Sequence, residues 1–194
     1  TNDPLLATER PCPRADLDQE ALASSPSIRA LLRSKVDLLS ECARVSGLKM
    51  DTLMEVYTLY SRMVVEHQNG FYWADLADPK ESNQSSFWTK QREIEVLNEL
   101  KPFALARWTH LWSSLFIKRI RSGELLTQIG ANFELKKANI LNTTMTNQVN
   151  SGEQILKNPK NLILFSTHDT KLGAVLHALD LWNHILIPYS TSLI

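Results

Sequence analysis

Apolar residues recur at helical spacing over much of the chain before residue 130. Ser24-Ser25-Pro26 is a typical helix start, because a capping serine precedes a proline whose missing N–H is not needed in the first turn. The apolar positions that follow predict one amphipathic helix that ends at Gly47. A second helix is expected from about Asp51 to the stop signal Asn69-Gly70.

A longer helical pattern begins near Ser86 and runs to Phe116. Pro102 is expected to bend it, because proline removes one backbone hydrogen bond. Ser122-Gly123 is expected to end the pattern, and a short helix through Ile129 is expected to follow. The first part of the chain therefore reads as mainly helical.

Tryptophans at positions 73, 88, 108 and 112 suggest either an aromatic ligand pocket or a packed core. The core is favoured, because tryptophan and leucine at helical spacing usually pack inside a protein. His67 and His110 have no carboxylate or cysteine at ligand spacing, so we interpret them as surface or packing histidines.

The pattern changes after a polar stretch, where the apolar run Leu162–Phe165 predicts a short buried strand. Ser166-Thr167-His168-Asp169 ends this run, and residues 170–181 predict a helix. A lone buried strand cannot satisfy its own backbone, so the rest of its sheet is expected from elsewhere. These elements predict the α/β class, with a mainly helical region over 1–160 and part of an α/β core over 161–194.

Composition narrows the class of protein. The chain has 194 residues, 43% of them hydrophobic, which suits a folded domain. Basic and acidic residues number 21 each, so the chain has no net positive charge that would attract nucleic acid or an anionic membrane. No apolar run approaches the roughly 20 residues that span a bilayer, and the first residues lack the pattern of a signal peptide. We expect a soluble chain, processed or partial, with no metal and no cofactor.

The two cysteines have different characters. Cys42 lies in a helical pattern and is expected to be a small core residue. Cys12 lies between two prolines and is the better candidate for a disulfide, although nothing pairs it with Cys42. Asn83-Gln84-Ser85 and Asn142-Thr143-Thr144 are N-glycosylation sequons in polar stretches that we expect to be surface loops of a secreted protein.

The predicted end of the strand carries the candidate chemistry. In open α/β sheets, ligands bind beyond the carboxyl ends of strands, and a following helix offers its N-terminus to an anion. His168 at this place can donate a hydrogen bond to a phosphoryl oxygen, and Asp169 can protonate a leaving alkoxide. On the dipeptide alone, however, a capping role for Asp169 and a turn role for His168 are favoured.

A resemblance to a known family changes that balance. The segments LILFSTHDTKLGAVLHALDLWN and IPYSTSL are similar to the strand, His-Asp turn, helix and Pro-Tyr segment of the histidine acid phosphatases, the group that contains prostatic and lysosomal acid phosphatases. Upstream, CPR at 12–14, VSGL at 45–48 and SGELLTQI at 122–129 resemble that family in order and spacing. The resemblance implies a histidine-phosphatase-like fold, here mostly the helical cap domain with one core strand and its following helix.

The resemblance also implies an activity, the hydrolysis of phosphate monoesters through a phosphohistidine intermediate. His168 would be the phosphate-binding histidine and Asp169 the general acid. The family's Arg-His-Gly nucleophile motif is absent, and its phosphate-binding arginines have no counterpart here. Loss of the nucleophile removes most of the rate enhancement, so these residues alone are expected to be poorly active or inactive.

Further expectations follow from the family. Cys12 would pair with a cysteine outside this chain, the protein would be secreted or lysosomal, and a homodimer is expected because the related enzymes are often dimers. A second function considered is a non-catalytic secreted interaction protein that binds through the Trp-rich helices. A purely intracellular helical module is disfavoured by the sequons and by the loop position of Cys12.

Overall fold

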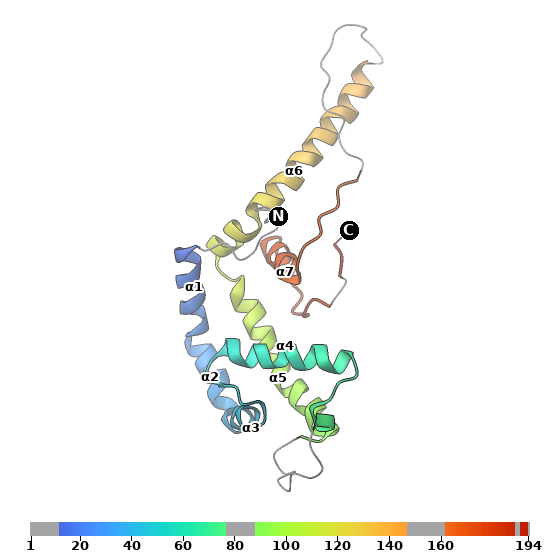
Figure 1. The fold of residues 1–194 in the computed structure, drawn as a ribbon. Coiled ribbons are helices and arrows are strands. Elements are labelled where there is room, and N and C mark those ends of the chain that lie inside the picture. Colours follow the sequence, from blue (N-terminus) through green and yellow to red (C-terminus); the bar gives the residue numbers. More distant parts are fainter. Residues whose placement is uncertain (1–11, 77–87, 147–161, 189–190, 194) are drawn as a thin grey trace. The chain divides into compact units, whose positions relative to one another are not determined.

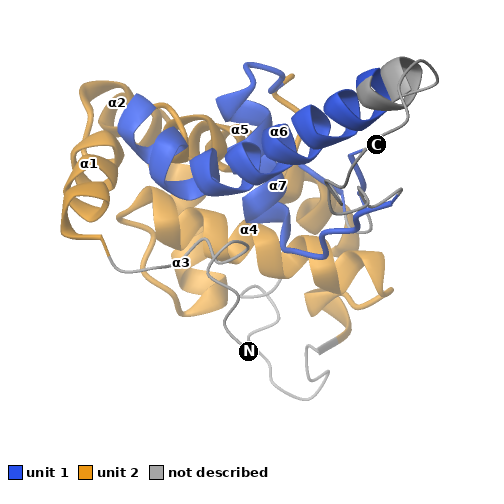
Figure 2. Cartoon of the chain, turned by 90° about the horizontal axis from the view of Figure 1, so that it is seen from above, with its two compact units in different colours: residues 1–11, 115–182, 187–194 blue, residues 12–114, 183–186 orange. Residues whose placement is uncertain are grey.

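The computed structural model describes residues 12–76, 88–146, 162–188 and 191–193. The described elements are, in order, α1 (Pro13–Ala23), α2 (Pro26–Ser34), α3 (Val36–Ser46), α4 (Leu53–Gln68), the 3₁₀ helix η1 (Trp73–Leu76), α5 (Lys90–Leu111), α6 (Leu115–Thr146) and α7 (Asp169–Ala178) (Figure 1). The chain divides into two compact units, which Figure 2 colours separately. Unit 2 contains residues 12–114 and 183–186, and unit 1 contains residues 115–182 and the chain from 187. The predicted predominance of helices is confirmed.

The first helices partly match the sequence pattern. Pro26 starts α2 after an extended Ser25, as predicted, but the expected single helix is divided at Lys35 (φ −129°, ψ 29°) into α2 and α3. Gly47 ends α3 with φ 69°, a left-handed conformation that favours glycine. Helix α1 was not predicted, and it begins at Pro13, where a proline fits the first helical turn.

Helix α4 has a complete capping box at its start. The Thr52 hydroxyl accepts the backbone N–H of Glu55 (3.3 Å), and the Glu55 carboxylate accepts the backbone N–H of Thr52 (2.9 Å). The helix ends at Gln68, directly before the predicted stop, and Gly70 has φ 79°. Both boundaries are therefore local in origin.

The core of unit 2 forms where α4 packs against α5. Its fully buried members come from α2, α3, α4 and α5 and are Ile28, Cys42, Val56, Leu59, Met63, Val96, Leu100 and Phe103. Trp88, Trp108 and Trp112 are also buried, which confirms that these tryptophans serve the core. Pro102 lies within α5 at an exposed position.

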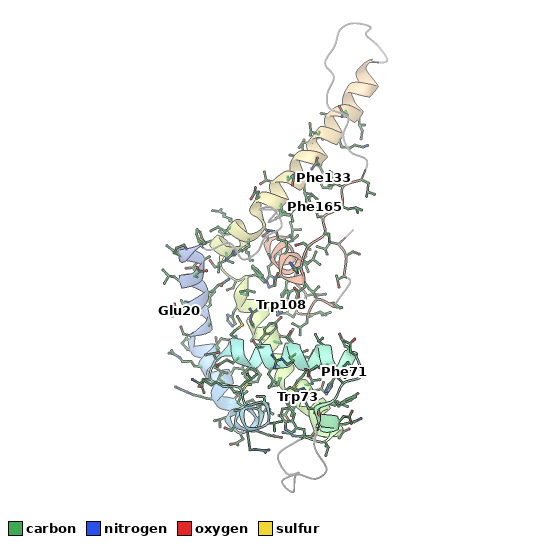
Figure 3. All side chains as sticks on the ribbon, viewed as in Figure 1. Glu20, Phe71, Trp73, Trp108, Phe133 and Phe165 are labelled. Atoms are coloured by element: carbon green, nitrogen blue, oxygen red, sulfur yellow. The ribbon has the colours of Figure 1, made fainter. Side chains whose placement is uncertain are left out.

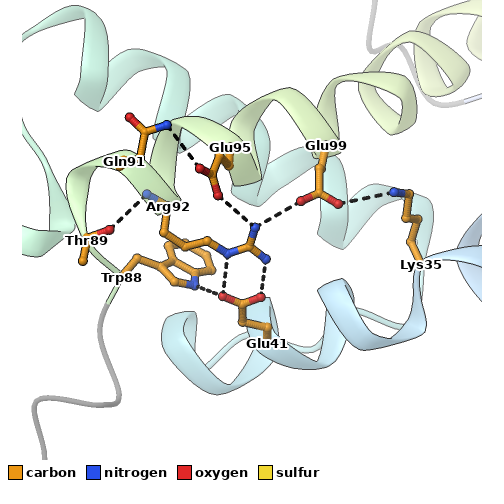
Figure 4. A network of polar contacts seen from close by, with 8 residues as sticks. All are labelled: Lys35, Glu41, Trp88, Thr89, Gln91, Arg92, Glu95 and Glu99. Atoms are coloured by element: carbon orange, nitrogen blue, oxygen red, sulfur yellow. Dashed lines mark hydrogen bonds and ion pairs between the residues drawn. The ribbon is translucent and has the colours of Figure 1, made fainter.

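A polar network joins α3 to α5 within unit 2 (Figure 4). The guanidinium of Arg92 donates to the Glu41 carboxylate through Nε (3.0 Å) and Nη2 (2.5 Å), and to Glu99 through Nη1 (3.1 Å). Glu41 also accepts the indole N–H of Trp88 (2.6 Å). Hydrogen bonding by Arg92 lowers the pKa of Glu41, so this carboxylate stays ionised to lower pH than usual.

In unit 1, α6 packs against α7. The predicted break at Ser122-Gly123 is wrong, because α6 continues through both residues. The Ser122 hydroxyl is hydrogen-bonded to the carbonyl of Lys118 (2.6 Å), one turn earlier, and to that of Ala174 (3.2 Å) in α7. These partners accommodate a serine inside the helix, so its presence does not end it. The helix predicted through Phe116 instead ends at Leu111, and α6 begins at Leu115.

The predicted strand Leu162–Phe165 is not seen in the described part of the chain, where residues 162–168 have no regular secondary structure and no strand is present. Leu162 and Leu164 are 73% and 82% exposed, whereas Ile163 and Phe165 are partly buried. This alternation is typical of an extended chain. A strand needs a neighbour for its backbone hydrogen bonds, and the described residues supply none. The α/β core is therefore not seen.

Candidate active site

The His168-Asp169 pair lies at the start of α7. His168 is the N-cap residue, in an extended backbone conformation (φ −84°, ψ 160°), and its side chain makes no capping hydrogen bond. Its carbonyl accepts the backbone N–H groups of Lys171 (3.0 Å) and Leu172 (3.3 Å). The imidazole is exposed, so it is accessible to a ligand.

Asp169 is the first residue of α7 and is half-buried. Its Oδ1 atom accepts the backbone N–H of Thr170 (2.7 Å). A carboxylate in the first turn is favourable beside the partial positive charge of a helix N-terminus. Asp169 is therefore not the N-cap residue that the alternative interpretation expected, although one of its two carboxylate oxygens binds an N–H group of the first turn.

Buried polar contacts hold the first half of α7 on α6. Lys171 is 3% exposed, and its Nζ atom donates a hydrogen bond to the backbone carbonyl of Arg121. One turn later, the carbonyl of Ala174 accepts the hydroxyl of Ser122 (3.2 Å). The helix that carries the His-Asp pair is therefore fixed by successive residues of α6.

The second half of α7 contains a buried histidine. His177 Nδ1 lies 2.8 Å from the carbonyl of Gly173, and its ring stacks on Trp182 with centroids 4.8 Å apart and planes inclined by 22°. This stacking covers the C-terminal end of α7. His177 is thus a packing residue and does not belong to the exposed N-terminal end.

Unit 2 contains a second histidine–carboxylate pair that the sequence analysis missed. His67 Nε2 lies 2.8 Å from Glu93 Oε2, and Glu93 is fully buried. The same carboxylate accepts the backbone N–H groups of Trp73 (3.1 Å) and Ala74 (2.6 Å). The pair therefore fixes η1 to α4 and α5. A sequence signal did exist, since Glu93 lies on the apolar stripe of α5 that includes Val96.

The structure agrees with some of the predictions for the cysteines and the sequons and differs from others. Cys42 is buried in the core as predicted, and burial raises the pKa of its thiol to about 12. Cys12 precedes α1, and both cysteines are free in the structure. Asn83 lies outside the described residues, whereas the backbone of Asn142 lies in α6 and not in the predicted loop.

The described residues show neither a membrane-spanning helix nor a cluster of metal-binding side chains. No helix among them has the length and hydropathy required to cross a bilayer. Within the same residues, histidine, cysteine, aspartate and glutamate side chains form no group of three or more that could hold a metal ion. The start of α7 offers an exposed imidazole, a carboxyl group and a helix N-terminus, which suit an anion and proton transfer.

Comparison with known proteins bears directly on this chemistry. Rat lysosomal acid phosphatase is 25% identical to the chain over 181 residues, 93% of this chain and 36% of the relative. Human lysosomal acid phosphatase is 28% identical over the same extent. Mouse prostatic acid phosphatase is 22% identical over 154 residues, 78% of this chain and 40% of the relative. The curated relatives of this chain are acid phosphatases. The predicted resemblance to the histidine acid phosphatases is confirmed.

No family model matches the chain, and no solved structure does. The chain spans only 36% of the length of the lysosomal relatives. The similarity is therefore to one part of these acid phosphatases, and both an activity of this chain and the roles of His168 and Asp169 are matters for proposal.

Proposed function

We propose that this chain is part of an acid phosphatase that hydrolyses phosphate monoesters through a phosphohistidine intermediate. His168 binds the phosphate, and Asp169 protonates the departing alcohol. One observation carries the proposal, namely that an exposed histidine and an aspartate begin α7 in a chain similar over 93% of its length to lysosomal acid phosphatases. A secreted or lysosomal location is proposed from the names of the relatives.

The proposed chemistry assigns a separate task to each group. The N-terminus of α7 carries a partial positive charge of roughly half a unit, which stabilises a phosphate dianion. His168 donates a hydrogen bond to a phosphoryl oxygen. As the nucleophilic histidine forms its P–N bond, the ester P–O bond breaks and the proton of Asp169 moves to the leaving oxygen. Water then attacks the phosphorus atom and gives a proton to the Asp169 carboxylate; the P–N bond breaks, inorganic phosphate leaves, and both side chains return to their starting states.

The nucleophile is proposed to lie outside these 194 residues, since the chain contains no Arg-His-Gly motif. The 194-residue chain by itself is then inactive or poorly active. Two exposed leucines, Leu162 and Leu164, support this arrangement, because in a complete α/β core the helices packed on the sheet would cover them. Burial of each leucine contributes roughly 1.5–3 kcal/mol, which favours such a partner.

Several expectations from the family stay predictions within this proposal. They are a disulfide between Cys12 and a cysteine outside this chain, a homodimer, and glycosylation of the sequons. Each concerns parts or partners beyond the described residues.

The second candidate is a non-catalytic secreted interaction protein. A binding surface formed by the Trp-rich helices is not supported, because Trp88, Trp108 and Trp112 are buried. The observation that favours this candidate lies instead in unit 1, where Phe133 on α6 is 71% exposed (Figure 3). A binding protein would use the exposed side chain of Phe133 on α6 as part of its contact surface, and this binding would not require Asp169.

Hydrolysis of a chromogenic phosphate monoester at acidic pH distinguishes the two candidates. The assay compares the 194-residue chain with the longest product of its gene, each as wild type and as Asp169→Asn. Asp180→Asn is the matched control, because Asp180 is exposed just beyond the other end of α7. We expect the longer form to be active, Asp169→Asn to lower its kcat by about 10²- to 10⁴-fold, and Asp180→Asn to have little effect.

Two results would contradict the phosphatase proposal. One is a longest gene product that hydrolyses no phosphate monoester at any pH from 4 to 7. The other is an active enzyme whose kcat is the same with Asp169→Asn as with Asp180→Asn. The first result favours the interaction protein, whereas the second refutes the role of Asp169 as general acid and leaves the activity standing.

A further inference from the structure

Lys171 is a buried lysine in the first turn of α7, two residues after Asp169. Lysine is rarely buried, because removing its ammonium group from water costs free energy unless polar partners compensate. Lys171 is nevertheless only 3% exposed, and its Nζ atom donates to the backbone carbonyl of Arg121 in α6. An apolar side chain would fill this position without that cost, so the lysine calls for an explanation beyond packing.

The backbone of Lys171 is bonded to the candidate site. Its N–H donates to the carbonyl of His168 (3.0 Å), the residue three positions earlier. Residues three apart lie on the same face of a helix, so Lys171 lies one turn after the N-cap residue His168 on that face. Its backbone therefore contacts His168 while its side chain contacts α6.

The contact to α6 belongs to a two-point attachment. Lys171 bonds to Arg121, and one turn later the carbonyl of Ala174 accepts the hydroxyl of Ser122 (3.2 Å). Both attachments use adjacent residues of a continuous helix. The Lys171 contact is the one closer to the His-Asp pair, so it determines where the first turn of α7 lies relative to α6.

We propose that Lys171 is a positioning residue for His168 and Asp169. This inference rests on the proposed phosphatase function and deepens it at the same site. The hydrogen bond to Arg121 fixes the first turn of α7, and thereby the two side chains that meet the phosphate and the leaving oxygen.

The test uses the longest product of the gene and three variants. Lys171→Met keeps the length of the side chain but removes the donor, and Lys171→Arg restores a donor. Lys137→Met is the matched control, because Lys137 is exposed on α6. For each protein, hydrolysis of p-nitrophenyl phosphate gives kcat and KM. Hydrogen exchange measured by mass spectrometry compares peptides from α7 with peptides from α4 and α5.

We expect Lys171→Met to lower kcat by about 10- to 100-fold, with a smaller change in KM, because a small displacement of a catalytic group has effects of this size. Exchange in the first turn of α7 should become faster, while α4 and α5 keep the wild-type rates. Lys171→Arg should recover most of the lost kcat, and Lys137→Met should match the wild type in both measurements.

The inference is overturned if Lys171→Met leaves the exchange of α7 unchanged, or if α7 exchanges faster while kcat stays at the wild-type value. Equal losses of kcat in Lys171→Met and Lys137→Met would also overturn it. A wild-type protein that hydrolyses no ester refutes the proposed function and the role of Lys171 together. An active wild type with an unaffected Lys171→Met variant refutes the role of Lys171 alone.

Discussion

Units 1 and 2 differ in how completely each covers its own apolar side chains. In unit 2, α3, α4 and α5 share a continuous buried core. In unit 1, the buried apolar side chains of the described residues are Ile117, Leu125, Ala174 and Val175, whereas its exposed ones include Phe133, Leu135, Ile140, Leu141, Leu162 and Leu164. Unit 2 has the core of an independently stable domain, and unit 1 presents an apolar surface of the kind that usually meets a partner.

The buried polar groups differ in the same way. Those of unit 2 stabilise its own architecture, as Glu93 does by binding His67 and η1. Those of unit 1 gather around α7, where Lys171 and Ser122 fix the helix that begins with the candidate site. Unit 1, which contains the candidate site at the start of α7, is thus also the unit whose apolar side chains need a partner to cover them.

The largest expected effect is the loss of core packing in unit 2. Phe103→Ala should lower the free energy of unfolding by about 3–5 kcal/mol, because it leaves a cavity at a fully buried position. Phe133→Ala, at an exposed position in unit 1, should change it by less than about 0.5 kcal/mol. Urea unfolding followed by tryptophan fluorescence measures both. Similar effects of the two substitutions would remove the distinction between the units.

The next effect concerns the buried carboxylate of unit 2. Glu93→Gln should cost about 2–4 kcal/mol, because an amide cannot match the charge-assisted bonds that Glu93 accepts from His67 and from the η1 backbone. The same unfolding assay measures this loss, with Glu124→Gln as the control at an exposed position of α6. A Glu93→Gln variant as stable as that control would show that the buried pair adds nothing to unit 2.

The Arg92 network should give a smaller effect that depends on pH. Arg92→Met should cost about 1–2 kcal/mol at neutral pH, since the network is partly exposed to solvent. The folded-state pKa of Glu41 is lowered by Arg92, so this stabilisation is complete above the usual pKa of a glutamate and is lost as the pH falls through the lowered value.

Unfolding at pH 7 and at about pH 3 tests that dependence. The difference between wild type and Arg92→Met should shrink at the lower pH. A difference that is constant over this range would show that the ion pair with Glu41 is not its source.

The smallest expected effect on stability is in the extended segment of unit 1. Leu164→Ser should change the free energy of unfolding by less than about 0.5 kcal/mol, because Leu164 is exposed. It should, however, reduce self-association of the 194-residue chain, as measured by light scattering, by removing part of an apolar surface. Scattering unchanged from the wild type would mean that this segment is not a contact surface.

Sequence patterns predicted helix ends well where the signal was local. The Gly47 and Asn69-Gly70 stops and the Ser25-Pro26 start all occur where expected, because these residues act on their own turns. The patterns failed at Ser122-Gly123, where packing against α7 and a hydrogen bond to Ala174 favour a continuous helix. The strand predicted at Leu162–Phe165 is not seen, because a strand depends on a neighbour and the described residues supply none.

The sequence by itself determined the helical character of the chain, the burial of Trp88, Trp108 and Trp112 and the candidate pair His168-Asp169, since these follow from periodicity and from a recognisable motif. Only the tertiary structure decided that His67 binds Glu93, 26 residues away, and that Lys171 binds Arg121, 50 residues away. Periodicity reports which face of a helix is buried, but it does not report which distant residue lies against that face. Contacts across such separations arise from the packing of whole helices.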